Sequence, residues 1–336
     1  METLQFAINA VFPILLLIIL GYFLKKKHFL EEPWFKKGNT FIFRICLPVM
    51  LFVNVYNLES FDKIEWTAVY YAMIATVVLF ALGVIFVKCT VPDDRQKGVI
   101  LQAVFRSNYA IIGLPLTEAL GGAEAVSMAT VLSACCIPLY NILAVLALTM
   151  FQNENGQKAD IKDTLKKIAT NPLICAVAAG FVVLGIRSLI PVNEEGLPVF
   201  TVKNNLPFLF TAINNLAKIC SPLALIILGG LFEFSAIKSK KRAIIIGTIV
   251  RVVVVPLVAI SALILLDWYG NMQIDKVAYP PLLALFGAPT AVSGAIMAQE
   301  MDCDGELAGQ LVVWTSIASI ATLFVFIYAL RALGLL

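Results

Sequence analysis

Ten long apolar segments dominate this sequence and limit the folds that the chain can adopt. A membrane-spanning helix needs about 20 mainly apolar residues. Charged residues make up 14% of the chain and its mean hydropathy is +0.90. Soluble domains, in contrast, carry about a quarter charged residues. We therefore predict an all-α polytopic membrane protein with ten transmembrane helices, at about 5–24, 39–57, 65–88, 98–120, 125–150, 171–190, 206–232, 242–266, 277–299 and 307–331.

Two proline motifs each occur twice, at the same spacing. The triplet Gly113-Leu-Pro115 precedes Gly287-Ala-Pro289 by 174 residues, and the same offset relates Arg44-Ile-Cys-Leu-Pro48 to Lys218-Ile-Cys-Ser-Pro222. Two matches at one offset indicate an internal repeat. We therefore interpret the chain as two copies of one five-helix unit.

The longest polar insert separates these two units. It runs over Gln152–Thr170 and contains Asn153, Asn155 and Gly156, which favour a loop. The predicted first repeat is thus 1–150, followed by a cytoplasmic linker at 151–170 and a second repeat at 171–336. Because each repeat has an odd number of helices, the second copy is inverted relative to the first, which is typical of alternating-access carriers.

The loop charges predict the orientation. The first, third, fifth and seventh loops hold 16 Lys and Arg residues, whereas the other side, with both termini, holds 5. Loops rich in Lys and Arg stay in the cytoplasm. We therefore predict a multi-pass protein of the cytoplasmic (inner) membrane with both termini external. The ninth loop is an exception, since it holds only acidic charges: Glu300, Asp302, Asp304 and Glu306.

The Gly-x-Pro triplets predict where substrate binds. A proline deep in a helix removes a backbone donor and clashes with the preceding turn, and the freed backbone groups cannot face lipid. Interrupted segments at corresponding positions of two halves indicate a transporter's binding site. We therefore predict that helices four and nine are interrupted, with Gly113, Pro115, Gly287 and Pro289 at the substrate site. An ordinary proline kink is the alternative.

Polar and charged residues near the triplets extend the predicted site. Asn108 lies shortly before Pro115, and Thr290 and Ser293 follow Pro289. Arg106 and Arg251 lie about nine residues inside their segments, where a side chain reaches the interface with difficulty. Because no Asp or Glu lies near a span centre, the interior is positive and suits an anion. The alternatives are interhelical hydrogen bonding by Asn108, and arginines bound to backbone carbonyls or to Glu118 or Glu300.

Other function classes find little support in the sequence. The 7 cysteines have no paired spacing and His28 is the single histidine, so we predict neither a metal site nor a cofactor. There is no catalytic Ser/His/Asp set, phosphate-binding loop or dinucleotide motif. The net charge of +3 gives no indication of nucleic-acid binding. We predict that the protein is not an enzyme.

Several stretches resemble the auxin efflux carrier family, which includes plant PIN auxin exporters and bacterial malonate or organic-acid transporters. Asn108-Tyr-Ala-Ile-Ile-Gly113-Leu-Pro115-Leu resembles its Asn-x4-Gly-x-Pro-Leu stretch, and Ala288–Glu300 resembles its ninth span, which ends in Ala-x-Glu. Pro222–Phe232 and Arg251–Pro256 resemble its seventh and eighth spans. The resemblance implies helices four and nine crossing at their breaks. It also implies a scaffold of helices 1, 2, 6 and 7, often forming a homodimer, beside a moving domain of helices 3–5 and 8–10.

Two differences from the plant members point to a bacterial type of carrier. Plant PINs have a second proline where this chain has Gly294, and a long hydrophilic loop where it has Gln152–Thr170. We therefore predict a secondary transporter of a small organic anion, coupled to Na⁺, to H⁺ or to no ion. The alternatives are a carrier of a neutral or amphipathic metabolite, and a membrane sensor that binds a ligand without transporting it.

Overall fold

The structure, a computed structural model, describes residues 2–57, 66–151, 170, 172–188, 190–191, 200–232, 235–270, 272 and 274–336. Helices account for nearly all of these residues, and no β-strand occurs among them. Most of the predicted linker 151–170 lies outside the described residues. The first part of the chain forms α1 (Glu2–Lys26), α2 (Glu32–Phe41), η1 (Ile42–Cys46), α3 (Leu47–Tyr56), α4 (Trp66–Thr90), α5 (Asp94–Phe105), η2 (Tyr109–Gly113) and α6 (Leu114–Thr149).

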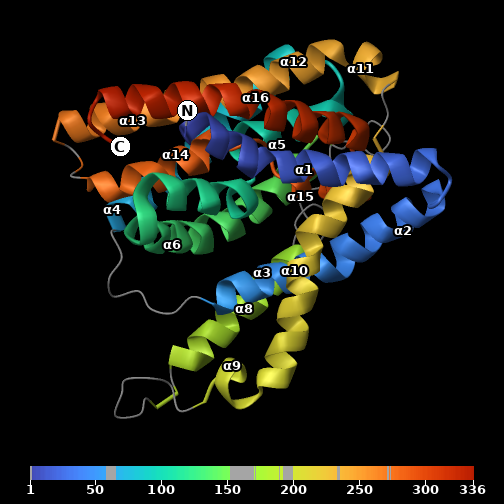
Figure 1. The fold of residues 1–336 in the computed structure, drawn as a ribbon, viewed down its shortest axis with the longest axis horizontal. Coiled ribbons are helices and arrows are strands. Elements are labelled where there is room, and N and C mark those ends of the chain that lie inside the picture. The colour runs from blue at the N-terminus through green and yellow to red at the C-terminus, as the bar shows by residue number, and fades with distance from the viewer. Residues whose placement is uncertain are drawn as a thin grey trace.

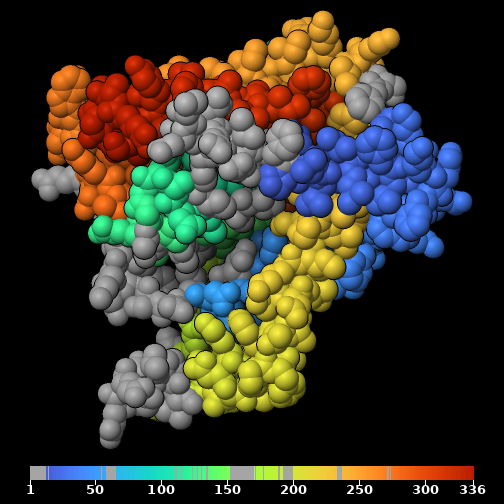
Figure 2. All heavy atoms as spheres, viewed as in Figure 1, coloured from blue at the N-terminus to red at the C-terminus, as the bar shows by residue number. Residues whose placement is uncertain are grey.

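The second part begins after the predicted linker. It forms α8 (Pro172–Ser188), α9 (Val202–Asn205), α10 (Pro207–Gly230), α11 (Ser235–Ser239), α12 (Lys241–Ile249), η3 (Val250–Val254), α13 (Val255–Trp268), η4 (Lys276–Ala278), α14 (Tyr279–Gly287), α15 (Val292–Glu300) and α16 (Gly305–Ala332). In Figure 1, α16, α13 and α1 lie along one side of the molecule, while α8, α9 and much of α10 project from it; Figure 2 shows the same projection as a separate lobe.

Five helical segments among the described residues are long and apolar enough to cross a membrane: Trp66–Thr90, Glu124–Thr149, Pro207–Gly230, Lys241–Trp268 and Gly305–Ala332. This result confirms an all-helical protein with apolar, span-length helices. The number of ten spans and the inverted repeat stay predictions.

The first interruption does not lie at the predicted triplet. Helix α5 ends at Phe105, and Arg106 has an extended backbone with φ −102° and ψ 111°. The chain resumes helical structure at Tyr109, so Pro115 falls in the first turn of α6. The second interruption does include its proline, because α14 ends at Gly287 and α15 begins only at Val292.

Pro115 instead follows a π-helical turn, as do Pro48 and Pro256. In η1, η2 and η3 the residue before the proline donates its N–H to the carbonyl five residues back: Leu47 to Ile42, Leu114 to Tyr109 and Val255 to Val250. Proline cannot donate to the carbonyl four residues back and clashes with it. A wider π turn accommodates both effects without ending the helix. For this physical reason, the prediction that Gly113-Leu-Pro115 interrupts helix four is wrong in position.

Helices α1 and α10 pack with their backbones nearly in contact. A Cβ added to Gly21 would lie 1.9 Å from the Ile226 carbonyl oxygen, and one added to Gly229 would lie 1.9 Å from the Ile18 oxygen. Small residues let membrane helices approach this closely, which increases dispersion contacts between them. Helices α1 and α10 are therefore closely packed against each other.

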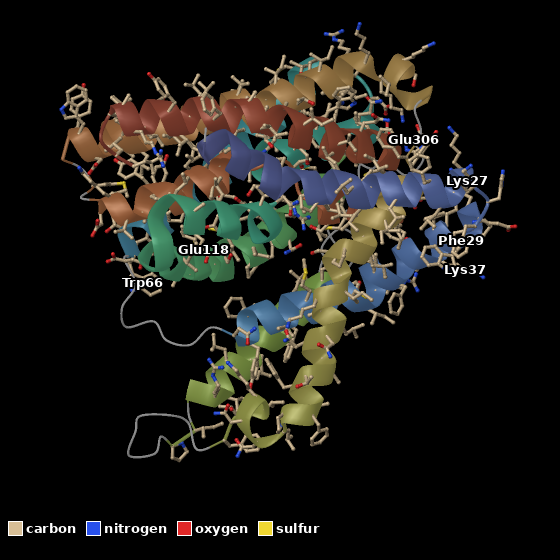
Figure 3. All side chains as sticks on the ribbon, in the orientation of Figure 1. Lys27, Phe29, Lys37, Trp66, Glu118 and Glu306 are labelled. Carbon is tan, nitrogen blue, oxygen red and sulfur yellow. The ribbon has the colours of Figure 1, made fainter. Side chains whose placement is uncertain are left out.

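Polar contacts tie several predicted cytoplasmic loops together. Lys240 bonds to Asp304 at 2.5 Å and to Glu306 at 2.8 Å, and Gln96 donates to Asp304 at 3.1 Å. Burial alone would lower the pKa of Lys240, but its bonds to Asp304 and Glu306 outweigh this effect and raise that pKa. Two acidic residues of the ninth loop, Asp304 and Glu306, thus share the positive charge of Lys240 on a neighbouring loop. In Figures 1 and 3, Lys27 and Glu306 lie at the end of the molecule opposite to both termini.

Candidate functional site

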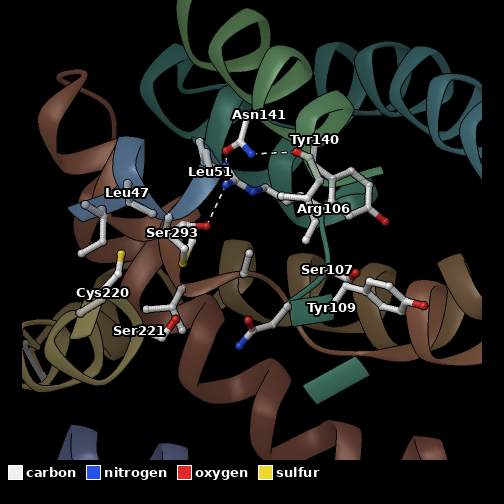
Figure 4. A pocket seen from close by; sticks show the side chains of 17 residues that line it. Leu47, Leu51, Arg106, Ser107, Tyr109, Tyr140, Asn141, Cys220, Ser221 and Ser293 are labelled. Atoms are coloured by element: carbon white, nitrogen blue, oxygen red, sulfur yellow. Dashed lines mark hydrogen bonds between the residues drawn. The ribbon is translucent and has the colours of Figure 1, made fainter. Parts of the chain in front are cut away.

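A small cavity lies where the two interrupted segments meet. It measures about 50 Å³, which is room for a few water molecules. Figure 4 shows the side chains that line it, which come from the first break, α6, the start of α15, α3 and α10. Its lining comprises Leu47, Met50, Leu51, Arg106, Ser107, Asn108, Tyr109, Ile137, Tyr140, Asn141, Cys220, Ser221, Ala224, Ala291, Val292, Ser293 and Ile296.

The two interruptions satisfy part of each other's backbone. Ser107 and Thr290 form an isolated antiparallel bridge, and the Asn108 N–H donates to the Pro289 carbonyl at 2.7 Å. The Thr290 N–H donates to the Thr315 Oγ1 at 3.1 Å. Backbone groups without a partner are costly inside a membrane. The extended residues are therefore stable because the two breaks lie against each other.

Arg106 projects from the first break into the cavity. Its guanidinium donates to Asn141 Oδ1 at 2.8 Å and Ser293 Oγ at 2.7 Å, as Figure 4 shows, and to Gln102 Oε1 at 3.1 Å. It also contacts Met297 Sδ at 2.8 Å. All of these partners are neutral. Within the described part of the chain, Arg106 forms no ion pair with a carboxylate, so its charge remains available to an anion.

Arg251 is bound in a different way, although it is also buried. Its guanidinium donates to the carbonyls of Ala288 at 2.9 Å, Phe286 at 2.8 Å and Leu285 at 3.3 Å, and to that of Val104 at 3.2 Å. These carbonyls lie at the C-terminal ends of α14 and α5. Such ends lack intrahelical donors and carry partial negative charge. Arg251 therefore caps both half-helices at once, and it does not line the cavity.

The opposite ends of the interrupted segments face the cavity. Asn108 is the N-cap of η2, Ala291 is the N-cap of α15, and both residues line the cavity. Helix N-termini present N–H groups and partial positive charge, which favour anions. The Asn108 Nδ2 is buried and has no hydrogen-bond partner in the described structure. An amide donor and two helix N-termini thus surround the same small space as Arg106.

The structure brings some of the predicted site residues together and separates others. Arg106, Asn108 and Ser293 line the cavity. Pro289 and Thr290 hold the break beside it through the backbone contacts described above. Gly113, Gly287 and Arg251 are not among the lining residues, and the side chain of Pro115 lies outside the described part of the structure.

Sequence reasoning missed two amides that position Arg106. Asn141 is 1% exposed, and its Nδ2 donates to the Ile137 carbonyl at 2.7 Å, which fixes the Oδ1 toward Arg106. Gln102 is also buried and lies one turn before Arg106. Each is a single amide inside an apolar segment, where a polar side chain needs a partner. A single amide in an apolar segment is therefore the sequence feature that could have identified Asn141 and Gln102.

Span-length apolar helices, together with a buried polar cavity at two helix breaks, define a polytopic membrane protein of the transporter class. The chain belongs to the membrane transport protein family, the family of the auxin efflux carriers, because the sequence pattern of that family matches residues 6–327. This is a family of transporters and not of enzymes. A search of the curated proteins found no match. In the described residues, no group of three or more His, Cys, Asp or Glu side chains could hold a metal ion.

Proposed function

We propose that this protein is a secondary transporter of a small organic anion. The observation that carries the proposal is Arg106, a buried cation that lines the cavity and has only neutral partners among the described residues. An uncompensated buried charge is unfavourable. A substrate carboxylate supplies the missing charge, and the N-termini of η2 and α15 stabilise it further.

The other side chains that line the cavity suit the carbon chain of a small organic anion. Leu47, Met50 and Leu51 of α3 and Ala224 of α10 give the lining an apolar part. The cavity volume of about 50 Å³ favours a short carbon chain. In our proposal the carboxylate binds to Arg106 and Asn108, while the carbon chain contacts this apolar part.

The position of the cavity also supports transport by alternating access. Helices α3 and α10 correspond to predicted spans two and seven, which belong to the proposed scaffold. Arg106, Asn141 and Ser293 belong to predicted spans four, five and nine of the proposed moving domain. Movement of one group against the other would expose a site at their boundary to each side in turn. In this proposal the chain has ten spans in two inverted repeats, and the homodimer stays a prediction.

Uptake into proteoliposomes tests this function. The purified protein is reconstituted and supplied with radiolabelled short-chain carboxylates and with their amides, under imposed Na⁺ or proton gradients. We expect accumulation of at least one carboxylate and much less of its amide. A neutral-metabolite carrier would accumulate amides equally well, and a sensor would bind a carboxylate without accumulating it. Either result would overturn the proposal.

Cysteine labelling tests the proposed topology. Lys27 and Tyr269 are both exposed, and they lie in the predicted first and eighth loops. In a variant without native cysteines, Lys27→Cys should react with an impermeant reagent only from the cytoplasmic side, and Tyr269→Cys only from outside. Labelling of both positions from one side would exclude the ten-span arrangement.

A further inference from the structure

A second cavity lies at the far end of α15 from Arg106. It measures about 600 Å³ and lies between α2 and the segment that connects α15 to α16. Three carboxylates line it: Glu32, Glu300 and Glu306. Two of them form ion pairs, Glu32 with Lys25 and Lys36, and Glu306 with Lys240. Glu300 forms no ion pair within the described part of the chain.

Glu300 is held in place by neutral donors from α2. Its Oε1 accepts hydrogen bonds from the Asn39 Nδ2 at 2.9 Å and from the Thr40 Oγ1 at 2.9 Å. These bonds join residues about 260 positions apart in the sequence. They fix the carboxylate at one place in the cavity wall without cancelling its charge.

Two residues that line this cavity each carry a buried oxygen atom without a donor in the described structure. Asn39 is 2% exposed, and its Oδ1 is buried without a hydrogen-bond partner in the described structure. The same holds for the Gln299 Oε1. Buried acceptors are nearly always satisfied, so each orphan needs an explanation. The residues of the wall thus include one carboxylate without an ion pair and two amide oxygens without a donor in the described structure. All of these oxygen atoms are hydrogen-bond acceptors.

We propose that Glu300, Asn39 and Gln299 form a binding site for a monovalent metal cation, for which Na⁺ is the probe. Hard cations bind carboxylate and amide oxygens, often with water completing the shell. A bound proton satisfies one oxygen, whereas a metal cation satisfies several at once. The single uncompensated carboxylate matches one positive charge.

Such a cation would tie α15 to α2. Helix α15 carries Ser293 near its start and Glu300 at its end, roughly 10 Å apart at the helical rise. A cation at Glu300 would therefore hold the helix that contributes Ser293 to the Arg106 cavity. Any coupling of the ion to transport rests on the proposed function. Ion binding does not, and the test below measures binding alone.

The test follows thermal unfolding of the full-length protein in detergent. Sodium chloride is titrated against choline chloride at constant ionic strength and pH. A ligand that binds only the folded state raises its stability as the concentration increases. We expect the unfolding midpoint to rise with Na⁺ and to saturate. In Glu300→Gln, which removes the charge but keeps an acceptor for Asn39 and Thr40, the rise should disappear.

Two variants complete the test. Glu118→Gln removes an exposed carboxylate of α6 that lies outside this cavity, and it should keep the full response to Na⁺. Gln299→Met removes one amide oxygen and no charge, and it should raise the Na⁺ concentration at half-effect several-fold. If Glu300→Gln does not fold, Gln299→Met still tests the proposed cation site.

Three results would overturn the site. The first is a wild-type midpoint that is equal in Na⁺ and choline. The second is a Na⁺ response that survives in both Glu300→Gln and Gln299→Met. The third is a midpoint that depends on pH and not on Na⁺, which would make Glu300 a proton site.

Discussion

Arg106 and Arg251 look alike in the sequence, but the structure uses them differently. Both are nearly inaccessible to solvent, at 4% and 0% exposure. Arg251 donates to four backbone carbonyls at the C-terminal ends of α5 and α14. Arg106 donates to neutral side chains, and it lines a cavity that Arg251 does not reach.

The difference shows how one type of residue serves two purposes at a pair of helix breaks. Each break creates a C-terminal end with exposed carbonyls and an N-terminal end with exposed N–H groups. A protein cation satisfies the C-terminal ends permanently. The N-terminal ends face a space where the protein supplies no anion among the described residues. The same local geometry therefore stabilises the fold on one side and favours an anionic ligand on the other.

The largest effect should follow from Arg251→Met. Methionine fills similar space but leaves the carbonyls of Val104, Phe286 and Ala288 without their donors. A buried acceptor left without its donor costs about 1–3 kcal/mol, and several are affected here. We expect a strongly lowered thermal unfolding midpoint in detergent and a poor yield. Arg331→Gln, at an exposed position near the end of α16, is the matched control and should unfold like the wild type.

A smaller effect should follow from Gly294→Ala, which tests how closely Arg106 is positioned. A Cβ on Gly294 would lie 3.0 Å from Gln102 Oε1, the atom that accepts a hydrogen bond from Arg106. The added methyl group should displace Gln102 at a cost of about 1 kcal/mol. We expect anion affinity to fall several-fold in calorimetry. Gly185→Ala, where an added Cβ meets no described residue within 4 Å, should bind normally.

The smallest effect should follow from Lys240→Met, because this lysine has the acidic partners that both arginines lack. Its contact with Glu306 is half-exposed. Asp304 is buried, but it keeps the Gln96 Nε2 and the Leu307 N–H as donors, so the variant should lose about 1 kcal/mol. Its pKa is raised in the folded state, so this contribution is complete below the ordinary lysine pKa and is lost as the pH rises through the folded value. Unfolding of wild type and variant should therefore converge at strongly alkaline pH. A difference that grows with pH would contradict this assignment.

The sequence predicted an all-helical protein with span-length apolar helices and three cavity residues, because those inferences depend on local composition. Apolar length predicts membrane helices, and Arg106, Asn108 and Ser293 are polar residues in apolar segments. The position of the first break was less predictable. Pro115 produces a π turn and Pro289 lies in an extended segment, although both are prolines in Gly-x-Pro triplets. The outcome depends on contacts between segments, such as the bridge from Ser107 to Thr290.

The roles of the two arginines also required tertiary structure. Both lie at similar depth in apolar segments, and periodicity does not show which group each one meets. Asn141 and Gln102 were missed for the same reason, since a single amide in a helix gives no indication of the direction in which it points. Carbonyl binding by Arg251 was one of the alternatives that the sequence left open.

The central claim is that Arg106, and not Arg251, provides the charge that binds an anion. Calorimetry with a transported carboxylate and its amide, on wild type and Arg106→Gln, tests it most directly. A charge-assisted hydrogen bond contributes about 1.5–3 kcal/mol, so its loss should weaken carboxylate binding roughly tenfold to a hundredfold. Amide binding should change little, and the thermal midpoint should fall less than in Arg251→Met, because removal of a buried unpaired charge offsets the donors that Asn141 and Gln102 lose. Equal weakening of both ligands, or unchanged carboxylate binding, would contradict the account.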